Sequence, residues 1–352
     1  MIRALVLVFS VSLIGAAIYF GQGMVLPACS NGEKVLFEVP EGDNLSQASR
    51  RLKKQGLIKD ILGFKILAKI TGNSVIRLGE YELSCAQTPL AILQILNKGV
   101  SVVRTITFPE GINVYEMAEQ LEASGLGEKK KFLELAFDKS FIKKLLGEEK
   151  YSLEGYLFPE TYGMTKYDGE EKLINLMVQK FFSAYEELIE KYGTSSMPVK
   201  LNRHEQVILA SIVEKETGEP SERPIIASVF YNRMKKNMRL QTDPTILYGI
   251  LDQTKVLKNN ITKKDIQTKT RYNTYRISGL PHGPIANPGA KALEAVLNPA
   301  STEYLYFVSR NDGTHVFSQT YKQHQNAVRK FQLDKSMREG RSWRDRYQKN
   351  SN

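Results

Sequence analysis

Two glutamates at the end of a long apolar run are the residues in this sequence most suited to chemistry. Glu214 and Glu216 follow residues 207–213, which we expect to form a buried helix that begins near His204. A carboxylate on an apolar helix is costly unless it is solvated or paired. Because desolvation raises the pKa of a carboxyl group, such a glutamate can hold a proton near neutral pH and donate it to a leaving oxygen.

The two glutamates do not share a face of the expected helix. Residues two apart on a helix point to nearly opposite sides, so at most one of them enters a given cleft. Glu214 lies on the side of the small Ser211, which leaves room for a ligand, whereas Glu216 lies on the side of large apolar residues. We therefore predict that Glu214 is the acid and base. In the alternative, both are ordinary residues at a helix end, paired with Lys215 and Arg223.

Other common catalytic sets are missing from the sequence. The pair His204-Glu205 is not followed by the second histidine of an HExxH zinc site, and no pair among the four histidines has the spacing of metal ligands. The sequence has no GxSxG elbow, P-loop or GxGxxG motif. Cys29 and Cys85 form no CxxC pair, and a single bridge between them stays open. We expect no metal and no cofactor.

The amino-terminal region has the composition of a membrane segment. Residues 4–26 contain no charged side chain, and about 20 apolar residues at 1.5 Å each span a bilayer core. Because Arg3 precedes this run, we predict a single-pass anchor with a cytoplasmic amino terminus and the remaining residues outside the cytoplasm. A cleaved signal peptide, or a lipoprotein box ending at Cys29, is the alternative. The net charge of +11 favours an anionic partner, but no nucleic-acid-binding signature accompanies it.

An internal repeat organises the region after this segment. The motif Val39-Pro-Glu-Gly42 recurs as Phe108-Pro-Glu-Gly111, and apolar positions continue to match as far as Gly56 and Gly125. Each copy predicts a strand, a turn, an amphipathic helix and a left-handed glycine cap. The first copy continues into a second helix and a second strand, which gives a βααβ unit.

These patterns predict an α+β protein. We expect a membrane anchor and linker in residues 1–30, a βααβ subdomain in residues 35–100, an intermediate βα-rich part in residues 101–200, a mixed α/β catalytic domain in residues 201–333 and a basic tail in residues 334–352. Residues 239–250 and 271–289 are expected to form loops, and Asn311-Asp-Gly313 predicts the turn of a hairpin.

Several ordered blocks of the sequence resemble one known family over nearly the whole chain. The blocks are LASIVEKET (209–217), Ser221-Glu222-Arg223, ASVFYNR (227–233), MRLQTDPT (238–245), Tyr248-Gly249, YNTY (272–275), GLP (279–281), IANPG (285–289), YLYFV (304–308) and EGYLFPETY (154–162). Together they are similar to the endolytic murein transglycosylases of the YceG-like family. The resemblance extends to the amino-terminal anchor and makes the βααβ unit LysM-like, although the first repeat departs from the usual LysM sequence.

The resemblance implies a lytic transglycosylase fixed to the cell membrane, with its catalytic domain on the periplasmic or outer side. Such enzymes cleave the β-1,4 bond between N-acetylmuramic acid and N-acetylglucosamine in nascent peptidoglycan strands and leave 1,6-anhydro ends, perhaps to terminate elongation. The family's catalytic glutamate falls on Glu214. One glutamate can act twice in this reaction, first as acid and then as base, with assistance from the muramyl acetamido group. Peptidoglycan synthases are candidate partners.

Further residues are candidates for substrate binding. Tyrosine rings, an amide and short polar side chains in the blocks could contact sugar, namely Ser211, Gln241, Thr242, Asp243, Tyr248, Tyr272, Asn273 and Tyr275. The aromatic members could equally be core, and Asp243 could merely form a turn before Pro244. Two other functions remain open: a non-catalytic peptidoglycan-binding scaffold, and a glycan hydrolase that pairs Glu214 with Asp243 as a second carboxylate.

Overall fold

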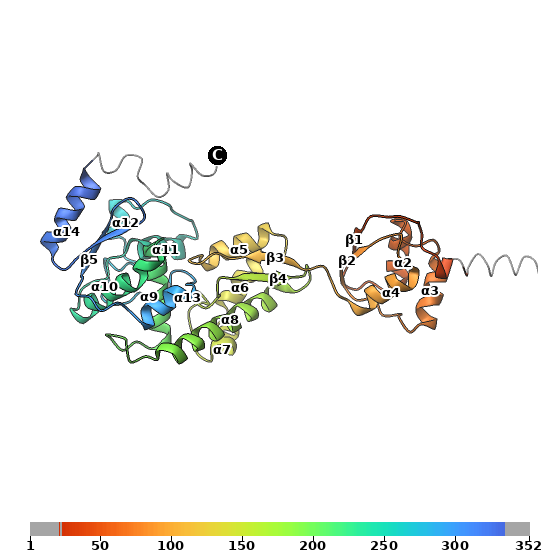
Figure 1. Ribbon diagram of the computed structural model, residues 1–352, viewed down its shortest axis with the longest axis horizontal. Coiled ribbons are helices and arrows are strands. Elements are labelled where there is room, and N and C mark those ends of the chain that lie inside the picture. The colour runs from red at the N-terminus through yellow and green to blue at the C-terminus, as the bar shows by residue number, and fades with distance from the viewer. Residues whose placement is uncertain (1–20, 22, 335–352) are drawn as a thin grey trace, which may run out of the picture. The chain divides into compact units, whose positions relative to one another are not determined.

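The computed structural model describes residues 21 and 23–334 of the chain (Figure 1). The chain forms two compact units, residues Met1–Thr105 with Gly163–Gly169, and residues Ile106–Tyr162 with Glu170–Asn352. Both units mix helices and strands. Most of the predicted anchor, residues 1–20 and 22, lies outside the described residues. Across the part of the chain that is described, no helix has the length and apolarity needed to cross a membrane.

The first unit is a two-stranded sheet covered by helices. Its elements are β1 (Val35–Val39), α2 (Leu45–Lys54), α3 (Ile61–Ile70), β2 (Gly79–Leu83) and α4 (Pro89–Lys98). The predicted order of strand, helix, helix and strand is therefore confirmed, while its likeness to LysM stays a prediction. The strands are antiparallel, with Phe37 opposite Tyr81, and both of these rings are buried in the core of the unit.

Both copies of the internal repeat form the predicted structure. In each, a strand leads through the Pro-Glu-Gly turn into a helix whose amino terminus is closed by an asparagine capping box, Asn44 for α2 and Asn113 for α5. The glycines that end these helices, Gly56 and Gly125, have φ values of +72° and +70°. The left-handed caps expected from sequence are confirmed, because glycine adopts this conformation without steric cost.

The second unit is mainly helical. Strand β3 (Arg104–Thr107) pairs with β4 (Thr161–Met164), and the division between the two units falls within both of these strands. Strand β5 (Tyr306–Ser309) pairs with β6 (His315–Ser318) around the predicted Asn-Asp-Gly turn. The helices are α5 (Val114–Ala123), α6 (Lys129–Phe137), α7 (Lys139–Leu146), α8 (Gly169–Tyr192), α9 (Arg203–Glu216), η1 (Pro220–Glu222), α10 (Arg223–Lys235), α11 (Asp243–Thr254), α12 (Lys263–Gln267), α13 (Ala290–Leu297), α14 (Tyr321–Val328) and η2 (Arg329–Leu333).

Helix α9 is the centre of this unit. It packs against α10, α11 and α13, and its residues from Gln206 to Glu214 are all buried. The helix predicted from the apolar run is confirmed. Asn202 caps its start, where the side chain accepts the backbone N–H of Glu205 and the Glu205 carboxylate accepts that of Asn202 in return.

The loop predicted for residues 239–250 is wrong over most of its length. Asp243–Thr254 forms helix α11, with Pro244 in its first turn, where the missing backbone N–H of proline costs nothing. Polar residues around a proline suggested a loop, but Ile246, Tyr248 and Leu251 are buried and the segment gains its stability from that packing.

Candidate active site

The Glu214 carboxylate is buried and holds two polar partners. Its Oε1 accepts a hydrogen bond from Nη2 of Arg223 at 2.6 Å, and its Oε2 accepts the backbone N–H of Gly289 at 3.0 Å. The Glu214 side chain is only 4% exposed and that of Arg223 9%. Arg223 begins α10 and Gly289 directly precedes α13, so three packed helices bring these groups together.

Opposing influences act on the pKa of Glu214. Burial is the largest, and it raises the pKa of this carboxyl group above its ordinary value. The Arg223 guanidinium and the Gly289 N–H lower the pKa, while the negative charge of Glu110 raises it. The outcome is a raised pKa. The site therefore favours the protonated acid and also supplies donors that stabilise the carboxylate formed when the proton leaves.

A second carboxylate, Glu110, lies beside this pair. Its Oε2 is 3.5 Å from Nη2 of Arg223, and a Cβ added at Gly289 would collide with its carboxylate. Nζ of Lys215 donates to the backbone carbonyl of Gly111 at 3.1 Å, which fixes the same turn. Glu110 belongs to the second Pro-Glu-Gly turn, and sequence reasoning did not single it out. The signal that could have found Glu110 is the repeated Pro-Glu-Gly motif. The corresponding glutamate of the first copy, Glu41, is exposed in the other unit.

A buried network holds the loops around Glu214. Nδ2 of Asn287 donates to Glu154 at 2.7 Å, and its Oδ1 accepts the backbone N–H groups of Gly155 and Leu157 at 2.8 and 3.0 Å. The backbone N–H of Asn287 donates to Ile112 at 2.9 Å. Asn287 thus joins the turn that carries Glu110, the segment at residues 154–162 and the loop that carries Gly289.

Glu154 is the charged member of this network. It also accepts hydrogen bonds from the backbone N–H of Val114 at 3.0 Å and from the Tyr248 hydroxyl at 2.8 Å. Burial raises the pKa of Glu154 to about 8, although these donors act in the opposite direction. Glu154 and Asn287 stand in two of the blocks that resemble the family, which is the signal that could have found them.

Glu216 does not join Glu214, as the helix geometry predicted. Leu209, Ile212 and Val213, on the same side of α9 as Glu216, are buried in the core as expected. Burial raises the pKa of the Glu216 carboxyl group to about 7. The neighbouring Thr242 hydroxyl and Arg233 lower the pKa, and the Asp243 charge raises it. The sequence did not predict these polar neighbours, because they come from other segments. Helix α11 starts at this point and delivers polar side chains there.

Four of the predicted substrate-binding residues cluster near Glu216. The Tyr275 hydroxyl donates to Asp243 at 2.7 Å, and the backbone N–H groups of Thr242 and Gln241 donate to Thr274 at 3.0 and 3.4 Å. Gln241 is exposed and has a φ of +50°, which few residues other than glycine adopt. Asp243 is thus engaged with Tyr275, and the contacts of Glu214 do not include it.

The other four candidates have internal partners. Ser211 accepts the backbone N–H of Ile285 at 3.0 Å and donates to the Ile208 carbonyl at 2.7 Å. Tyr248 and Tyr272 are buried, with ring centroids 4.8 Å apart. The Asn273 amide donates to carbonyls of residues 265–268. Contact of these residues with substrate stays a prediction, and their positions show that they support the loops around the site.

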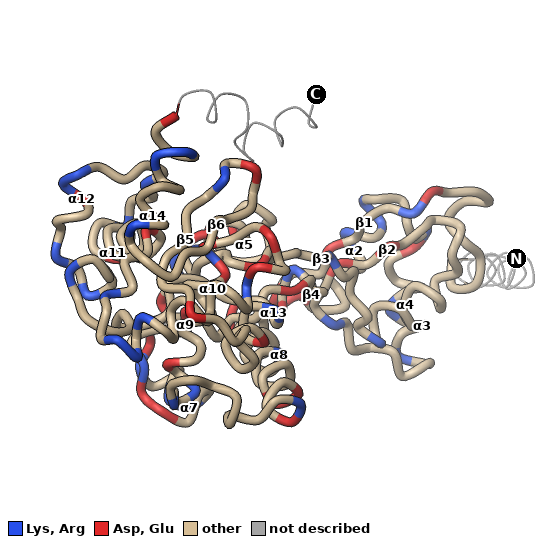
Figure 2. Tube along the Cα trace, turned by 60° about the vertical axis from the view of Figure 1, so that its left-hand side comes forward, with Lys and Arg blue, Asp and Glu red and all other residues tan. Residues whose placement is uncertain are grey.

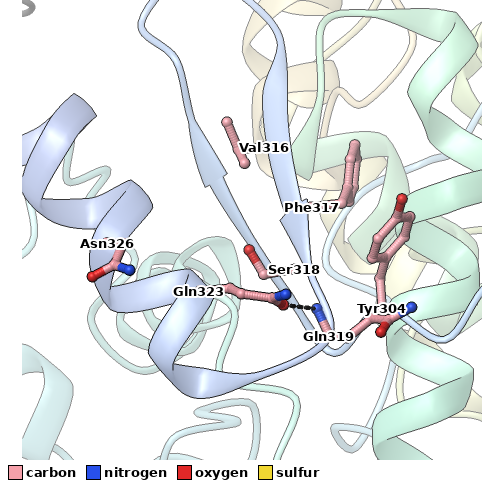
Figure 3. A pocket seen from close by; sticks show the side chains of 7 residues that line it. All are labelled: Tyr304, Val316, Phe317, Ser318, Gln319, Gln323 and Asn326. Carbon is pink, nitrogen blue, oxygen red and sulfur yellow. Dashed lines mark hydrogen bonds between the residues drawn. The ribbon is translucent and has the colours of Figure 1, made fainter.

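An open pocket of about 490 Å³ lies between the β5–β6 hairpin and α14 (Figure 3). The side-chain Oε1 of Gln323 accepts the backbone N–H of Gln319 there at 3.1 Å. Next to the pocket lining, Glu222 accepts the backbone N–H of His315 at 2.9 Å, which attaches the hairpin to the residue before Arg223. The lining residues are Tyr304, Val316, Phe317, Ser318, Gln319, Gln323 and Asn326. None of the site residues predicted from sequence lines it.

Metal ligands do not gather in the described part of the chain. Among residues 21 and 23–334, no group of three or more histidine, cysteine, aspartate or glutamate residues is placed to hold a metal ion. The groups that meet at Glu214 are its own carboxyl group, whose pKa is raised, the Arg223 guanidinium and the Gly289 N–H.

Comparisons with known proteins place this site in a family context. The YceG-like family model matches residues 37–330. An endolytic murein transglycosylase of Bacillus subtilis is 34% identical over 335 residues, which cover 91% of this chain and 91% of that protein. One of Streptococcus pneumoniae serotype 2 is 30% identical over 344 residues, covering 88% of this chain and 61% of that protein. A crystal structure of a YceG-like protein from Listeria monocytogenes has a TM-score of 0.55 and 32% identity, covering 84% of this chain and 99% of that one.

Proposed function

The chain belongs to the YceG-like family, and we propose that it is an endolytic murein transglycosylase that uses Glu214 as its acid and base. The observation that carries the proposal is a buried carboxyl group with a raised pKa, held between a guanidinium and a backbone N–H. Its substrate is the β-1,4 bond between N-acetylmuramic acid and N-acetylglucosamine in nascent peptidoglycan strands. Its product carries a 1,6-anhydro end, which terminates the strand.

The reaction uses the carboxyl group of Glu214 twice, once to donate a proton and once to accept another. Protonated Glu214 donates to the glycosidic oxygen as the bond from that oxygen to C1 of the muramyl residue breaks, with the acetamido group assisting at C1. The Glu214 carboxylate then accepts the proton of the C6 hydroxyl, while the C6 oxygen bonds to C1 and the acetamido group leaves C1. Glu214 ends the cycle protonated, and no water is consumed.

The neighbours of Glu214 suit both halves of this cycle. Burial and the charge of Glu110 favour the protonated form that the first half needs. Arg223 and the Gly289 N–H stabilise the carboxylate that exists between the two halves. A group that acts as acid and then as base works best when its pKa lies near the working pH, and the raised pKa of Glu214 is a shift in that direction.

We also propose that the enzyme acts outside the cytoplasm and is anchored in the cell membrane by residues 4–26. A disulfide joins Cys29 to Cys85, and disulfides persist in oxidising compartments. The structure thereby answers the question about these cysteines that the sequence left open, and a bonded Cys29 does not fit the lipoprotein alternative. The first unit is proposed to hold glycan in the manner of a LysM domain, with peptidoglycan synthases as partners.

One observation favours a second candidate, a hydrolase with two carboxylates. The predicted partner Asp243 is bonded to Tyr275, but Glu110 lies beside Arg223 and its side chain is 46% exposed. A glycosidase of this kind would activate water with the second carboxylate. Its product would carry an added water molecule instead of an anhydro ring.

The test compares the full chain in detergent with two matched variants on purified, uncross-linked glycan strands. Glu214→Gln removes the acid, and Glu216→Gln makes the same change two residues further along the same helix. We expect anhydro ends from the wild type and from Glu216→Gln, and about a 100- to 10,000-fold lower rate from Glu214→Gln. Ends that carry water would support the hydrolase. Equal rates from all three proteins would refute a catalytic role for Glu214, and binding without cleavage would indicate a scaffold.

A further inference from the structure

Helix α3 of the first unit is apolar on two sides. Phe64 and Ala68 are buried in the core of the unit. Leu62, Ile66 and Ile70 follow one another at intervals of four residues, and they are 52%, 38% and 72% exposed. Residues four apart lie on one side of a helix, so these three form a continuous exposed stripe. A surface helix normally carries polar residues opposite its buried side, and an apolar stripe in that place marks a contact surface.

The stripe begins where the apolar amino-terminal segment ends. Asp60 caps α3 by accepting the backbone N–H of Gly63. Gly23 lies against the same aspartate, since a Cβ added at Gly23 would be 3.0 Å from Cβ of Asp60. Residues 4–26 carry no charge, and Gly23 is near their end. The start of α3 and the end of the apolar segment are therefore neighbours within one unit (Figure 1).

The disulfide limits how far the unit can move from that segment. Cys29 is bonded to Cys85, and its backbone N–H also donates to the Cys85 carbonyl at 3.0 Å. Only two residues separate Leu26 from Cys29, so the chain between them spans at most about 10 Å. If residues 4–26 cross a bilayer, the first unit is held against its surface.

The charges beside the stripe fit a lipid surface. Lys59, Lys65 and Lys69 lie on or next to α3, and the one acidic side chain among residues 59–70, Asp60, accepts the backbone N–H of Gly63 as the helix cap. Lys and Arg positions mark this part of the unit in Figure 2. Long lysine side chains can lay their methylenes along apolar surface and keep the ammonium group in the headgroup layer. A helix that combines an apolar stripe with lysines typically lies in the plane of an anionic membrane surface.

We propose that α3 lies on the outer surface of the membrane, with Leu62, Ile66 and Ile70 at the boundary of the acyl chains and the three lysines against anionic headgroups. This inference rests on the proposed anchoring of residues 4–26. It gives the first unit a second attachment, which fixes its orientation on the bilayer in addition to its distance from it. Transglycosylase activity is not required for it.

The test places a tryptophan at the stripe of the full chain in vesicles. Trp343 is the single tryptophan, so Trp343→Phe provides the background. Ile66→Trp and Ile70→Trp report on the stripe. Val100→Trp is the control, because Val100 is 76% exposed and the next residue, Ser101, accepts the backbone N–H of Glu80 at the end of the β1–β2 sheet that lies away from Cys85. The vesicles contain phosphatidylethanolamine and phosphatidylglycerol, with brominated or ordinary acyl chains.

We expect brominated chains to quench both stripe variants roughly threefold or more above the control, because an interfacial helix buries its apolar side about 5–10 Å into the boundary. Equal quenching of all three variants would overturn the proposal. Blue-shifted emission without quenching at the stripe would also overturn it, since another protein surface would then cover α3. Alkaline extraction of the vesicles separates the two ideas: extracted protein contradicts the anchor, whereas retained but unquenched protein contradicts the role of α3 alone. Unfolding temperatures matching the background protein establish that the variants fold.

Discussion

The buried carboxyl group of Glu154 makes the stability of the second unit depend on pH. Its folded-state pKa is raised from 4.5 to about 8 by burial. The folded state therefore holds a proton that the unfolded chain releases near pH 4.5. The stabilisation is fully present below that pH and is lost as the pH rises through about 8. At 1.36 kcal/mol for each pH unit, this interval corresponds to on the order of 5 kcal/mol.

The perturbation is Glu154→Gln, which keeps the shape of the side chain and removes its titration. Asn287 and Val114 can still donate to the amide oxygen, and the Tyr248 hydroxyl can turn to accept from the amide nitrogen. We expect the variant to be close to the wild type in stability near pH 5. It should become the more stable protein towards about pH 8.5, by several kcal/mol.

Urea unfolding of the full chain in detergent, followed by far-ultraviolet circular dichroism between about pH 5 and pH 8.5, measures the difference. Glu187→Gln, at an exposed position on α8, controls for the loss of a carboxylate. If the difference in the free energy of unfolding between Glu154→Gln and the wild type is constant with pH, Glu154 does not titrate as we expect. A difference that falls with rising pH would show that Glu154 is charged and stabilised by its donors.

Two further predictions concern the site and its frame. Arg223→Met removes the charge that lowers the pKa of Glu214, so the loss of activity at high pH should move to higher pH. The rate at the optimal pH should fall about 100-fold, because the carboxylate is misplaced. An unchanged pH profile would contradict the role of the ion pair. Gly155→Ala should lower the free energy of unfolding of the unit by about 3 kcal/mol in urea, because φ is +86° and the added Cβ would lie 2.6 Å from Pro284 and 2.7 Å from Val207. A loss below about 1 kcal/mol would show that these neighbours can move to make room for the methyl group.

The sequence by itself determined the local helices and strands, and it singled out Glu214 at the end of an apolar helix as the candidate for chemistry. The buried helix α9 follows from its apolar run, and the repeated strand, turn and helix follow from the two Pro-Glu-Gly motifs. These are properties of neighbouring residues, since periodicity and caps act within a few positions. Glu214 could be chosen over Glu216 for the same reason, because the direction of a side chain on a helix depends only on its position.

Tertiary structure decided which groups surround that residue. Glu110, Arg223 and Gly289 come from three distant segments, and their meeting at Glu214 depends on how the turn, α10 and α13 pack. Tertiary packing also stabilises α11 where the sequence suggested a loop, and it places Asp243 in a hydrogen bond with Tyr275 and not beside Glu214. A pKa is set by all charges and burial within a few ångströms, and residues far apart in the sequence supply most of them here. The sequence could therefore single out Glu214 as the candidate acid, but only the folded chain shows the groups that shift its pKa.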